Sequence, residues 1–380
     1  MIKKKIIFFV NHAAFFVSHR LNLAVSAKKQ GLNVEIILGN PASIEEEKRA
    51  IKILKNKKIK IKKFPFSSAE TSLLNNILCL FKIFFYLKNN KTDIIHLISP
   101  KAILLGGIIA RILKIQLMII SISGMGYIFT NKLNLKEKMI KKIYLFILKF
   151  ILQHKKKKII VQNTYDYYFF KKNFNLSLKE IVKIKGSGVN LKNFLKIKIE
   201  NSYKTVSLIG RIIKEKGILE YIEASKILKK NHQDWKFNLI GSLDYDKPSK
   251  FSKKTIINWK KDKYVNIFGY QANIKNIYSK SSIICLPSYR EGMPKTILEA
   301  SAAGRPVIAT NVIGCNEAVV NKKTGELCKV KSVKSLVSKL DKLIKNKKLR
   351  EYYGKNGRQF AIKNFDIKDV TKKIMLIYKS

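Results

Sequence analysis

The sequence predicts an α/β protein made of two doubly wound domains, each with a parallel sheet covered by helices on both faces. Three observations lead to this fold class. Short apolar runs alternate with longer helical stretches from the first residues onward, which is the rhythm of strand–helix repeats. The 380 residues are enough for two or three domains of ordinary size. The rhythm also stops near residue 190 and starts again near residue 205.

The N-terminal domain, residues 1–190, is expected to be one Rossmann-like unit of six strand–helix repeats. Its apolar runs are almost uninterrupted, which is typical of parallel strands buried on both faces. The expected strands are 5–10, 33–38, 59–63, 93–98, 116–122 and 157–162. The expected helices are 20–30, 44–56, 70–88, 101–113, 134–153 and 164–173.

A linker is predicted over residues 191–203, because this stretch is polar and has no strand pattern, and two glycines precede it. A second Rossmann-like domain is expected over 204–362. Its expected strands are 205–210, 236–241, 264–268, 282–286 and 306–310, with closing helices at 332–346 and 348–362. A last helix in 363–380 would be free to return to the first domain. We expect the two sheets to face a cleft, with ligands beyond the carboxyl ends of the strands.

The chain is strongly basic, with 77 Lys and Arg against 25 Asp and Glu and a formal net charge of +52. Most of these cations are lysines spread along the whole length, so part of the excess reflects general amino-acid usage. Proteins that read nucleic acids favour Arg for bidentate base contacts and place stacking aromatics on a recognisable module. The sequence shows no such pattern, so we expect no nucleic-acid partner and favour an anionic membrane surface.

The cysteines and the apolar runs bear on the compartment. The cysteines form no C-x-x-C pair and lie near no His at metal-ligand spacing, which argues against a disulfide framework and a zinc site. The apolar run after the basic N-terminus is five residues long, too short for a signal peptide. Longer apolar runs are broken by Lys or Arg before they reach spanning length. We expect a cytoplasmic protein that is soluble or lies on a membrane.

The first cluster with chemical potential follows the strand that ends at Gly210. There Arg211, Lys216 and Gly217 lie where the chain passes from the strand into a helix. Gly210 allows close approach of the backbone, and the two cations together with a helix N-terminus would suit a diphosphate. The alternative is an exposed basic turn, which is common in a chain so rich in lysine.

The second cluster spans residues 285–300, where a strand ends, a tight loop follows and a helix begins near Pro294. Two carboxylates are spaced as Glu-x7-Glu, with Glu291 in the loop and Glu299 on the helix. This arrangement suits hydrogen bonds from sugar hydroxyls, since each carboxylate can accept several. The alternative is an ordinary turn residue and an ordinary helix carboxylate.

Together these clusters resemble glycosyltransferase family 4, in which Gly-Arg and Lys-Gly precede Glu-x7-Glu as Gly210-Arg211, Lys216-Gly217 and Glu291-x7-Glu299 do here. Other segments that resemble the family pattern are 15–20, 123–129, 186–194, 314–317 and 324–325. The resemblance implies two Rossmann-like domains of the GT-B type and transfer of a sugar from a nucleotide donor with retention of anomeric configuration. The chain is similar to bacterial enzymes that build capsule, lipopolysaccharide or other glycans on undecaprenyl diphosphate.

The resemblance also implies a role for each matching residue. The implied catalytic residues are Arg211 and Lys216, which would hold the donor diphosphate and neutralise the leaving nucleotide, and Glu291, which would bind the transferred sugar. The implied donor-binding residues are Gly210, Gly292, Met293, Pro294, Glu299 at the ribose and Tyr270 near a base expected to be uracil. No cofactor is implied, because the nucleotide sugar is a co-substrate, and no metal site is expected.

The acceptor is expected in the N-terminal domain, at His19, Arg20, Ser123 and Gly124. His19 and Arg20, at an expected helix start, would be placed to meet an acceptor phosphate. Many family members carry a His where this chain has Ser123, so the role of that His does not transfer. For the other histidines near strand ends, such as His12 and His96, a structural role is expected.

These observations predict a retaining, metal-independent hexosyl-type transferase that moves a sugar from a UDP-sugar to a polyprenyl-diphosphate-linked glycan. A non-hydrolysing nucleotide-sugar epimerase on the same fold is an alternative. A non-catalytic basic protein that binds nucleic acid or lipid through lysine alone is another. We expect the protein on the inner face of the cytoplasmic membrane, because lysines within 52–63 precede an apolar helix with Phe81, Phe84 and Phe85. That helix would alternatively pack on the first sheet.

Overall fold

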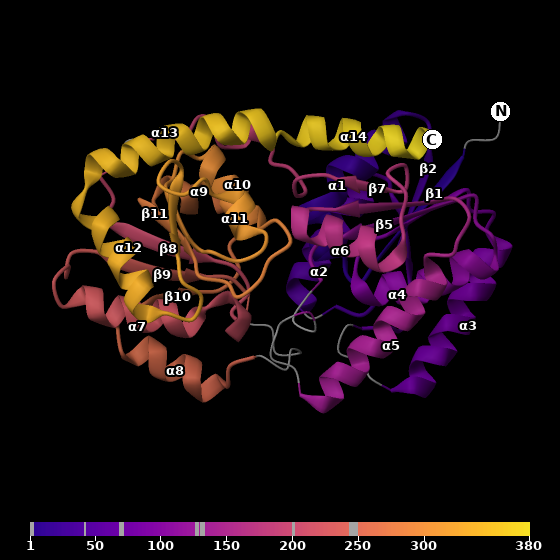
Figure 1. The fold of residues 1–380 in the computed structure, drawn as a ribbon, viewed down its shortest axis with the longest axis horizontal. Helices are drawn as coiled ribbons and strands as arrows, with labels where there is room; N and C mark the ends of the chain where they lie inside the picture. Colours follow the sequence, from indigo (N-terminus) through magenta and orange to yellow (C-terminus); the bar gives the residue numbers. More distant parts are fainter. Residues whose placement is uncertain are drawn as a thin grey trace. The chain divides into compact units, whose positions relative to one another are not determined.

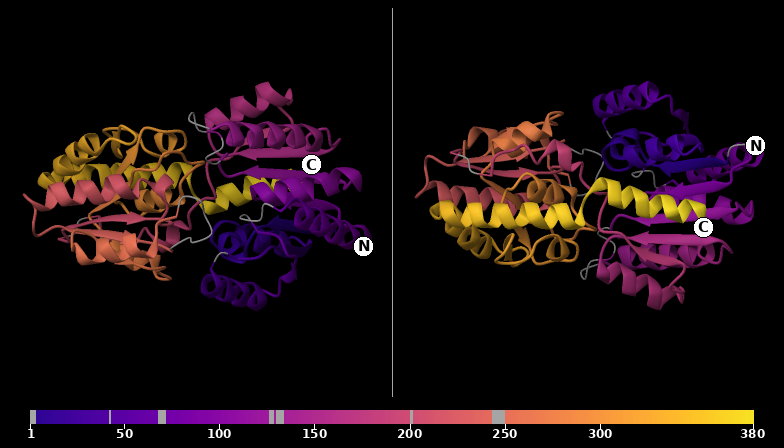
Figure 2. Two further views of the ribbon diagram at one scale, coloured as in Figure 1. Left: turned by 90° about the horizontal axis from the view of Figure 1, so that it is seen from below. Right: turned by 90° about the horizontal axis from the view of Figure 1, so that it is seen from above.

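The computed structural model of the chain describes residues 4–41, 43–67, 72–125, 129, 134–199, 202–242 and 250–380. The chain divides into two compact units, Met1–Ser187 with Asp369–Ser380 and Gly188–Lys368. Each unit is built around one parallel sheet with helices on both faces (Figure 1, Figure 2). The α/β class with two doubly wound sheets, predicted from the sequence, is confirmed.

The first unit, Met1–Ser187 with Asp369–Ser380, has its strands in the order β3-β2-β1-β4-β5-β6-β7. The strands are β1 (Lys5–Val10), β2 (Asn33–Leu38), β3 (Lys60–Lys63), β4 (Ile94–Leu97), β5 (Leu117–Ile122), β6 (Lys157–Val161) and β7 (Ile181–Lys183). From β1 the chain moves outward to β3 and then returns to the other side of β1 with β4. The connections therefore diverge between β1 and β4, the place where doubly wound sheets bind ligands.

Two sets of helices cover this sheet. The helices are α1 (Ala13–Lys29), α2 (Ile44–Asn56), α3 (Leu73–Asn89), α4 (Pro100–Ile112), α5 (Leu135–Ile151), α6 (Thr164–Phe174) and α14 (Ile367–Lys379). One apolar core lies between the sheet and α3, α4, α5 and α6. The other lies between the opposite face and α1, α2 and α14.

The start of α1 differs from the expected helix at 20–30, which was wrong by about two turns. The helix begins at Ala13, and its buried positions Ala13, Phe16, Leu23, Ala24 and Ala27 follow helical spacing along its whole length. The buried carboxylate of Glu47 accepts hydrogen bonds from the backbone N–H groups of Ala13 at 2.8 Å and Ala14 at 3.1 Å. This carboxylate stabilises the N-terminus of α1.

The second unit, Gly188–Lys368, has its strands in the order β10-β9-β8-β11-β12-β13. The strands are β8 (Thr205–Ile209), β9 (Lys236–Ile240), β10 (Asn266–Phe268), β11 (Ile283–Leu286), β12 (Val307–Thr310) and β13 (Gly325–Cys328). The helices are α7 (Ile218–Lys229), α8 (Lys253–Lys261), α9 (Ile274–Ser279), α10 (Lys295–Ala302), α11 (Cys315–Ala318), α12 (Val333–Lys345) and α13 (Lys347–Asn364). Here the connections diverge between β8 and β11.

Two edge strands, β7 and β13, have no counterpart among the expected strands. β7 has three residues and β13 has four, with the sequence Gly-Glu-Leu-Cys. Both strands are too short to show a recognisable strand pattern in the sequence, and short strands are common at the edges of sheets. The six expected strand–helix repeats of the first unit are present as β1–α1 through β6–α6, and β7 adds a seventh strand that was not expected.

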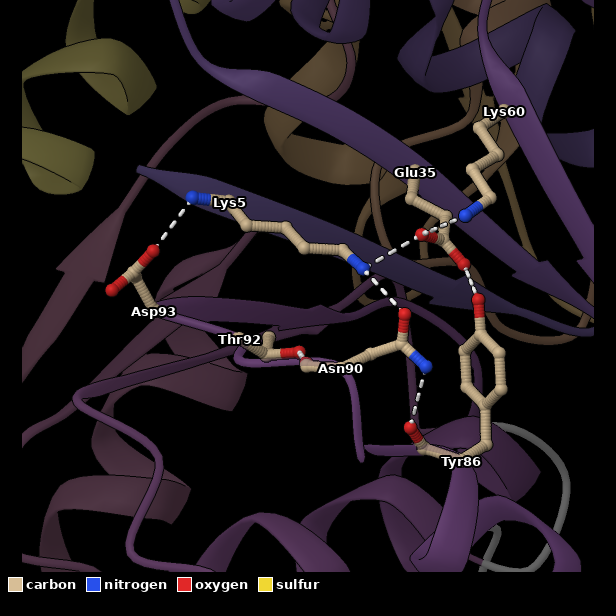
Figure 3. Close-up of polar contacts among 7 residues, drawn as sticks. All are labelled: Lys5, Glu35, Lys60, Tyr86, Asn90, Thr92 and Asp93. Atoms are coloured by element: carbon tan, nitrogen blue, oxygen red, sulfur yellow. Dashed lines mark hydrogen bonds and ion pairs between the residues drawn. The ribbon is translucent and has the colours of Figure 1, made fainter. Parts of the chain in front are cut away.

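The helix α3 packs on the sheet through one face and exposes the other. Cys79, Ile83 and Leu87 are buried, and the Tyr86 hydroxyl donates a hydrogen bond to the buried carboxylate of Glu35 (Figure 3). That carboxylate also pairs with the ammonium groups of Lys5 at 2.9 Å and Lys60 at 3.8 Å. These contacts fix the rotation of the helix.

As a result, Phe81 and Phe85 are turned outward, with 54% and 56% of their surface exposed. Phe84, expected with them, is half-buried against the core. The alternative expectation, that this helix packs on the first sheet, is confirmed, and the opposite face of the helix stays exposed.

The C-terminal helix α14 contributes to the first unit through Tyr378. The Tyr378 hydroxyl lies 2.7 Å from His96 Nδ1, and His96 Nε2 lies 2.7 Å from the Ser121 hydroxyl. Burial, with a smaller contribution from the charge of Arg20, holds the pKa of His96 well below its ordinary value. The ring is neutral and packed in the core, which accounts for this histidine structurally.

Candidate functional site

The two sequence clusters follow directly on the two central strands of the second unit. β8 and β11 are paired neighbours, with Val206 opposite Ile283. The loop after β8 carries Gly210, Arg211 and Lys216, and the loop after β11 leads through Glu291 to α10. Since both strands are parallel, both loops lie at the same edge of the sheet. This is the point where the strand connections diverge and where such sheets bind ligands.

Backbone contacts hold these two loops against each other. Gly217 adopts a left-handed conformation with φ of +69°, and a Cβ atom there would lie 2.1 Å from the carbonyl oxygen of Pro287. The Tyr289 N–H donates to the carbonyl oxygen of Glu215 at 2.9 Å. The positive φ and the lack of room for a Cβ atom both require glycine at position 217. The close approach of the two loops brings the Lys216 and Glu291 side chains together.

Lys216 and Glu291 form an ion pair between the ammonium and Oε1. The two side chains are only 19% and 13% exposed, so the pair is largely shielded from water. A cation and an anion therefore stand side by side at the carboxyl ends of β8 and β11. The side chain of Arg211 is exposed at the start of the same loop.

The turn around Glu291 is supported by the loop that follows the neighbouring strand β12. The Glu291 N–H donates to the carbonyl oxygen of Ile313 at 3.1 Å. Gly314 has φ of +82°, and a Cβ atom there would lie 2.4 Å from the carbonyl oxygen of Gly292. Gly292, Met293 and Pro294 are buried, and the Met293 side chain packs in the core. These three residues shape the loop through their backbone.

Glu299 lies one helical turn further along α10 than Lys295 and is 8% exposed. Its Oε1 pairs with the Lys295 ammonium at 3.0 Å, and its Oε2 accepts a hydrogen bond from the Tyr278 hydroxyl at 3.1 Å. The Thr296 hydroxyl donates to the carbonyl oxygen of Ile209 at 3.0 Å, which ties the start of α10 to the end of β8.

Sequence reasoning missed Lys295 and Tyr278. The i,i+4 spacing of Lys295 and Glu299 was visible in the sequence. Tyr278 lies 21 residues before Glu299 on another helix, and no sequence pattern links the two. Tyr270 follows β10, two strands from β8 and thus roughly 10 Å away by ordinary strand spacing. Its side chain is 49% exposed, and it takes no part in the Lys216–Glu291 pair.

The expected acceptor residues lie in the first unit. His19 is stacked on Phe15 with ring centroids 4.2 Å apart, and its Nδ1 lies 3.1 Å from the Phe15 carbonyl oxygen. Arg20 is 4% exposed, donates to the His19 carbonyl oxygen at 3.1 Å, and has its pKa lowered to about 10 by burial. Both residues lie well inside α1, so the expectation that they stand at a helix start is wrong.

Ser123 and Gly124 follow β5, next to β4 in the sheet. The Ser123 hydroxyl is buried and has no hydrogen-bond partner within the part of the chain that the structure describes. Gly124 has φ of +120°. Residues 126–128 of the same sequence pattern lie outside the described residues.

The residues that the structure describes offer neither a metal-binding cluster nor a membrane-spanning helix. Among these residues, no group of three or more His, Cys, Asp or Glu side chains is arranged to hold a metal ion. Over the same ranges, no helix has the length and apolar character needed to cross a bilayer.

Comparisons with known proteins agree with this geometry. The family model described as "Glycosyl transferases group 1" matches residues 189–360, and the one described as "Glycosyl transferase 4-like" matches residues 5–163. The chain is 29% identical, over 97% of each protein, to the N,N'-diacetylbacillosaminyl-diphospho-undecaprenol alpha-1,3-N-acetylgalactosaminyltransferase of Campylobacter jejuni. It is 28% identical to the UDP-Gal:alpha-D-GlcNAc-diphosphoundecaprenol alpha-1,3-galactosyltransferase of Escherichia coli, over 81% of this chain and 80% of the other.

The structure is similar to that of the Anabaena protein HepE, solved with UDP and glucose, with a TM-score of 0.76. The two sequences are 15% identical over 99% of this chain and 100% of that one, so this likeness concerns the fold. The two family models, the full-length relative and the fold lead to one conclusion. The chain belongs to the group 1 glycosyltransferases of family 4 and is a retaining glycosyltransferase of GT-B fold.

Proposed function

We propose that this enzyme transfers a hexose or hexosamine from a UDP-sugar to a glycan carried on a polyprenyl diphosphate, in the synthesis of a bacterial surface polysaccharide or glycoconjugate. The names of the Campylobacter and Escherichia relatives describe enzymes of this kind, with undecaprenyl-diphosphate-linked acceptors. The observation that carries the proposal is the Lys216–Glu291 pair at the carboxyl ends of β8 and β11, with Glu299 on α10, the helix that follows the same loop.

In this proposal the donor lies across the two loops of the second unit. Glu299 accepts hydrogen bonds from the ribose hydroxyls, Arg211 and Lys216 face the diphosphate, and Glu291 accepts from hydroxyls of the sugar. The ion pair fits this order, because the sugar is attached directly to a phosphate. A cation for the phosphate and a carboxylate for the sugar must then be neighbours, as Lys216 and Glu291 are.

The chemical contribution of the two cations is electrostatic. When the bond between the anomeric carbon and the phosphate oxygen breaks, negative charge gathers on the departing diphosphate. The ammonium of Lys216 and the guanidinium of Arg211 would stabilise that charge, as a divalent cation does in other transferases. We therefore propose that transfer needs no bound metal, and the test is the effect of EDTA on turnover.

The decisive experiment is a transfer assay. The protein is incubated with a panel of radiolabelled nucleotide sugars and a polyprenyl-diphosphate-linked sugar acceptor, and the label that enters the lipid phase is identified. We expect one UDP-sugar to label the lipid, and only when the acceptor is present. Conversion of the donor sugar without acceptor would instead establish an epimerase. Binding that survives Glu291→Gln and disappears with salt, without any transfer, would indicate a non-catalytic basic protein.

We also propose that the enzyme works as a peripheral protein on the anionic inner face of the cytoplasmic membrane, because a prenyl-anchored acceptor cannot leave the bilayer. The first unit offers a surface of the right chemistry, the α3–α5 apolar surface. Its exposed side chains are Leu74, Ile77, Leu78, Phe81 and Phe85 on α3 and Leu135, Met139, Ile140, Ile143, Phe146 and Phe150 on α5. Exposed apolar surfaces of this extent mark sites of interaction.

The exposed apolar side chains recur at helical spacing on both helices. On α3 the positions 74, 78, 81 and 85 form one stripe, and on α5 the positions 139, 143, 146 and 150 repeat the same spacing. Both helices pack against α4, which lies between them. The two apolar stripes, on helices that flank α4, would enter the region where headgroups meet acyl chains, as surface-bound amphipathic helices do.

Lysines surround this apolar surface, which favours an anionic membrane as the partner over a second protein. Exposed lysines on the two helices are Lys82, Lys88, Lys138, Lys142 and Lys149. The segment before α3 adds the exposed Lys62, whose ammonium lies 5.3 Å from the centre of the Tyr86 ring on α3. Each lysine near an anionic surface contributes about 1 kcal/mol, so a few of them suffice for reversible binding.

A further inference from the structure

Glu299 is held at both carboxylate oxygens by side chains of the second unit. Tyr278 donates to Oε2 at 3.1 Å, and the Lys295 ammonium pairs with Oε1 at 3.0 Å. Lys295 is 25% exposed and stands on the same helix, whereas Tyr278 is fully buried and comes from α9. The buried contact is therefore the one that fixes the carboxylate relative to the rest of the unit.

The ring, the backbone and the hydroxyl of Tyr278 each contact another residue of the second unit. Its ring meets that of Phe194 edge-on, with centroids 5.5 Å apart, and Arg305 Nε donates to its carbonyl oxygen at 2.8 Å. The hydroxyl also lies 3.2 Å from the carbonyl oxygen of Thr296. Burial, and next the charge of Glu299, raise the pKa of Tyr278 well above its ordinary value, so the hydroxyl keeps its proton and remains a donor.

A carboxylate that must receive two ribose hydroxyls gains from being fixed in advance, because a rotating side chain would lose its freedom when the nucleotide binds. Each carboxylate oxygen accepts two hydrogen bonds, so the Tyr278 contact still leaves Oε2 able to accept one more. We propose that Tyr278 is a positioning residue that orients Glu299 toward the ribose of the donor nucleotide, with Lys295 aligning the other oxygen. This inference rests on the proposed function, in which Glu299 binds the ribose.

A buried tyrosine hydroxyl on a glutamate also serves plain stability elsewhere in the same unit, which supplies a matched control. Tyr353, 2% exposed, donates to Oε1 of the fully buried Glu326 at 2.8 Å. That carboxylate also pairs with a lysine, Lys339, at 2.9 Å. The pair joins α13 to the edge strand β13, two strands away from β11. Tyr353→Phe therefore removes an equivalent contact without touching the site.

The test compares UDP affinity in the full-length variants by calorimetry, together with kcat and KM for the sugar donor. Tyr278→Phe should weaken UDP binding about 3- to 30-fold, and raise KM with little change in kcat, as expected when an orienting hydrogen bond is lost. Tyr353→Phe should lower the unfolding temperature about as much as Tyr278→Phe does, and it should leave UDP affinity unchanged. Equal UDP affinity in Tyr278→Phe and the wild-type chain would overturn the proposal.

Glu299→Gln separates this inference from the function on which it rests. We expect Glu299→Gln to weaken UDP binding and to remove most of the further effect of Tyr278→Phe, since residues that act through one another are not additive. Weakening by Glu299→Gln without any by Tyr278→Phe would overturn the positioning role alone. An unchanged affinity in Glu299→Gln would overturn the ribose contact and with it the positioning role.

A second variant keeps the test open if Tyr278→Phe fails to fold. Lys295→Gln changes a partly exposed side chain, so it leaves the core intact. It should weaken UDP binding in the wild-type background and have little effect in the Glu299→Gln background. Equal effects in both backgrounds would show that Lys295 contacts the nucleotide directly, which would contradict its role in aligning Glu299.

Discussion

Replacing one phenylalanine in each stripe of the α3–α5 apolar surface should release the enzyme from membranes. The double variant Phe81→Ser with Phe146→Ser removes two aromatic rings and leaves every lysine in place. Both rings are exposed in the first unit, so the folded state loses little packing when they are removed. The variant therefore separates apolar insertion from electrostatic attraction.

The size of the effect follows from the exposed area. A phenylalanine presents about 200 Å², and apolar area that leaves water gains ~25 cal/mol per Å². Phe81 is 54% exposed and Phe146 is 76% exposed, so complete burial would gain roughly 3 and 4 kcal/mol. Surface-bound helices bury their apolar face only in part. With about half of this area buried, the double variant should bind on the order of 100-fold more weakly.

The assay is co-sedimentation with vesicles of phosphatidylcholine with and without phosphatidylglycerol, at low and high salt. Ile44→Ser is the matched control, because Ile44 is 68% exposed on α2, which covers the opposite face of the same sheet. We expect the control to bind as the wild-type chain does. Full binding by the double variant, or no preference for anionic vesicles in the wild-type chain, would refute the reasoning while leaving the transferase assignment intact.

Four further outcomes are expected. Arg211→Ala and Lys216→Ala should each lower kcat/KM about 10- to 1000-fold without unfolding the protein, as charge on the leaving diphosphate loses a partner; full activity in both would remove the diphosphate clamp. Glu291→Gln should chiefly lower kcat and Glu299→Gln should chiefly raise KM, and the opposite assignment would mean that the donor lies the other way round. EDTA should leave turnover unchanged, and a loss that Mg²⁺ restores would contradict a metal-free reaction. The free energy of unfolding should fall as the pH drops below the ordinary His pKa of about 6.5, because the unfolded chain binds a proton at His96 that the folded chain, whose His96 pKa is lowered, does not. The free energy of unfolding, measured with urea at a series of pH values, should depend on pH less steeply in His96→Asn, by up to ~1.4 kcal/mol per pH unit. An unchanged pH dependence would show that His96 is not responsible.

The sequence by itself determined the fold class and the position along the chain of the two loops that we propose bind the donor. Strand and helix periodicity are local properties, so the alternation that predicts two doubly wound sheets can be read without knowing any contact. The loop with Gly210 and Lys216 and the Glu291-x7-Glu299 segment each lie within one strand–loop–helix unit. Their local geometry is therefore set by neighbouring residues, and the carboxyl ends of parallel strands meet at one edge.

Only the tertiary structure decided which side chains meet. Lys216 and Glu291 are 75 residues apart, and the close packing of Gly217 on Pro287 brings them together. The hydrogen bond from Tyr278 to Glu299 depends on how α9 packs against α10. The burial of Arg20 follows from the start of α1 at Ala13, where Glu47 from another helix caps it.

The α3–α5 apolar surface depends on tertiary structure for the same reason. An apolar stripe on a helix can face a core or the solvent, and its spacing is identical in both cases. On α3, the contacts of Tyr86 with Glu35 and of Ile83 with the core fix the rotation of the helix, and only then does the second stripe point outward. Periodicity is local and can be read from the chain, whereas the direction of a face depends on residues that are distant in sequence.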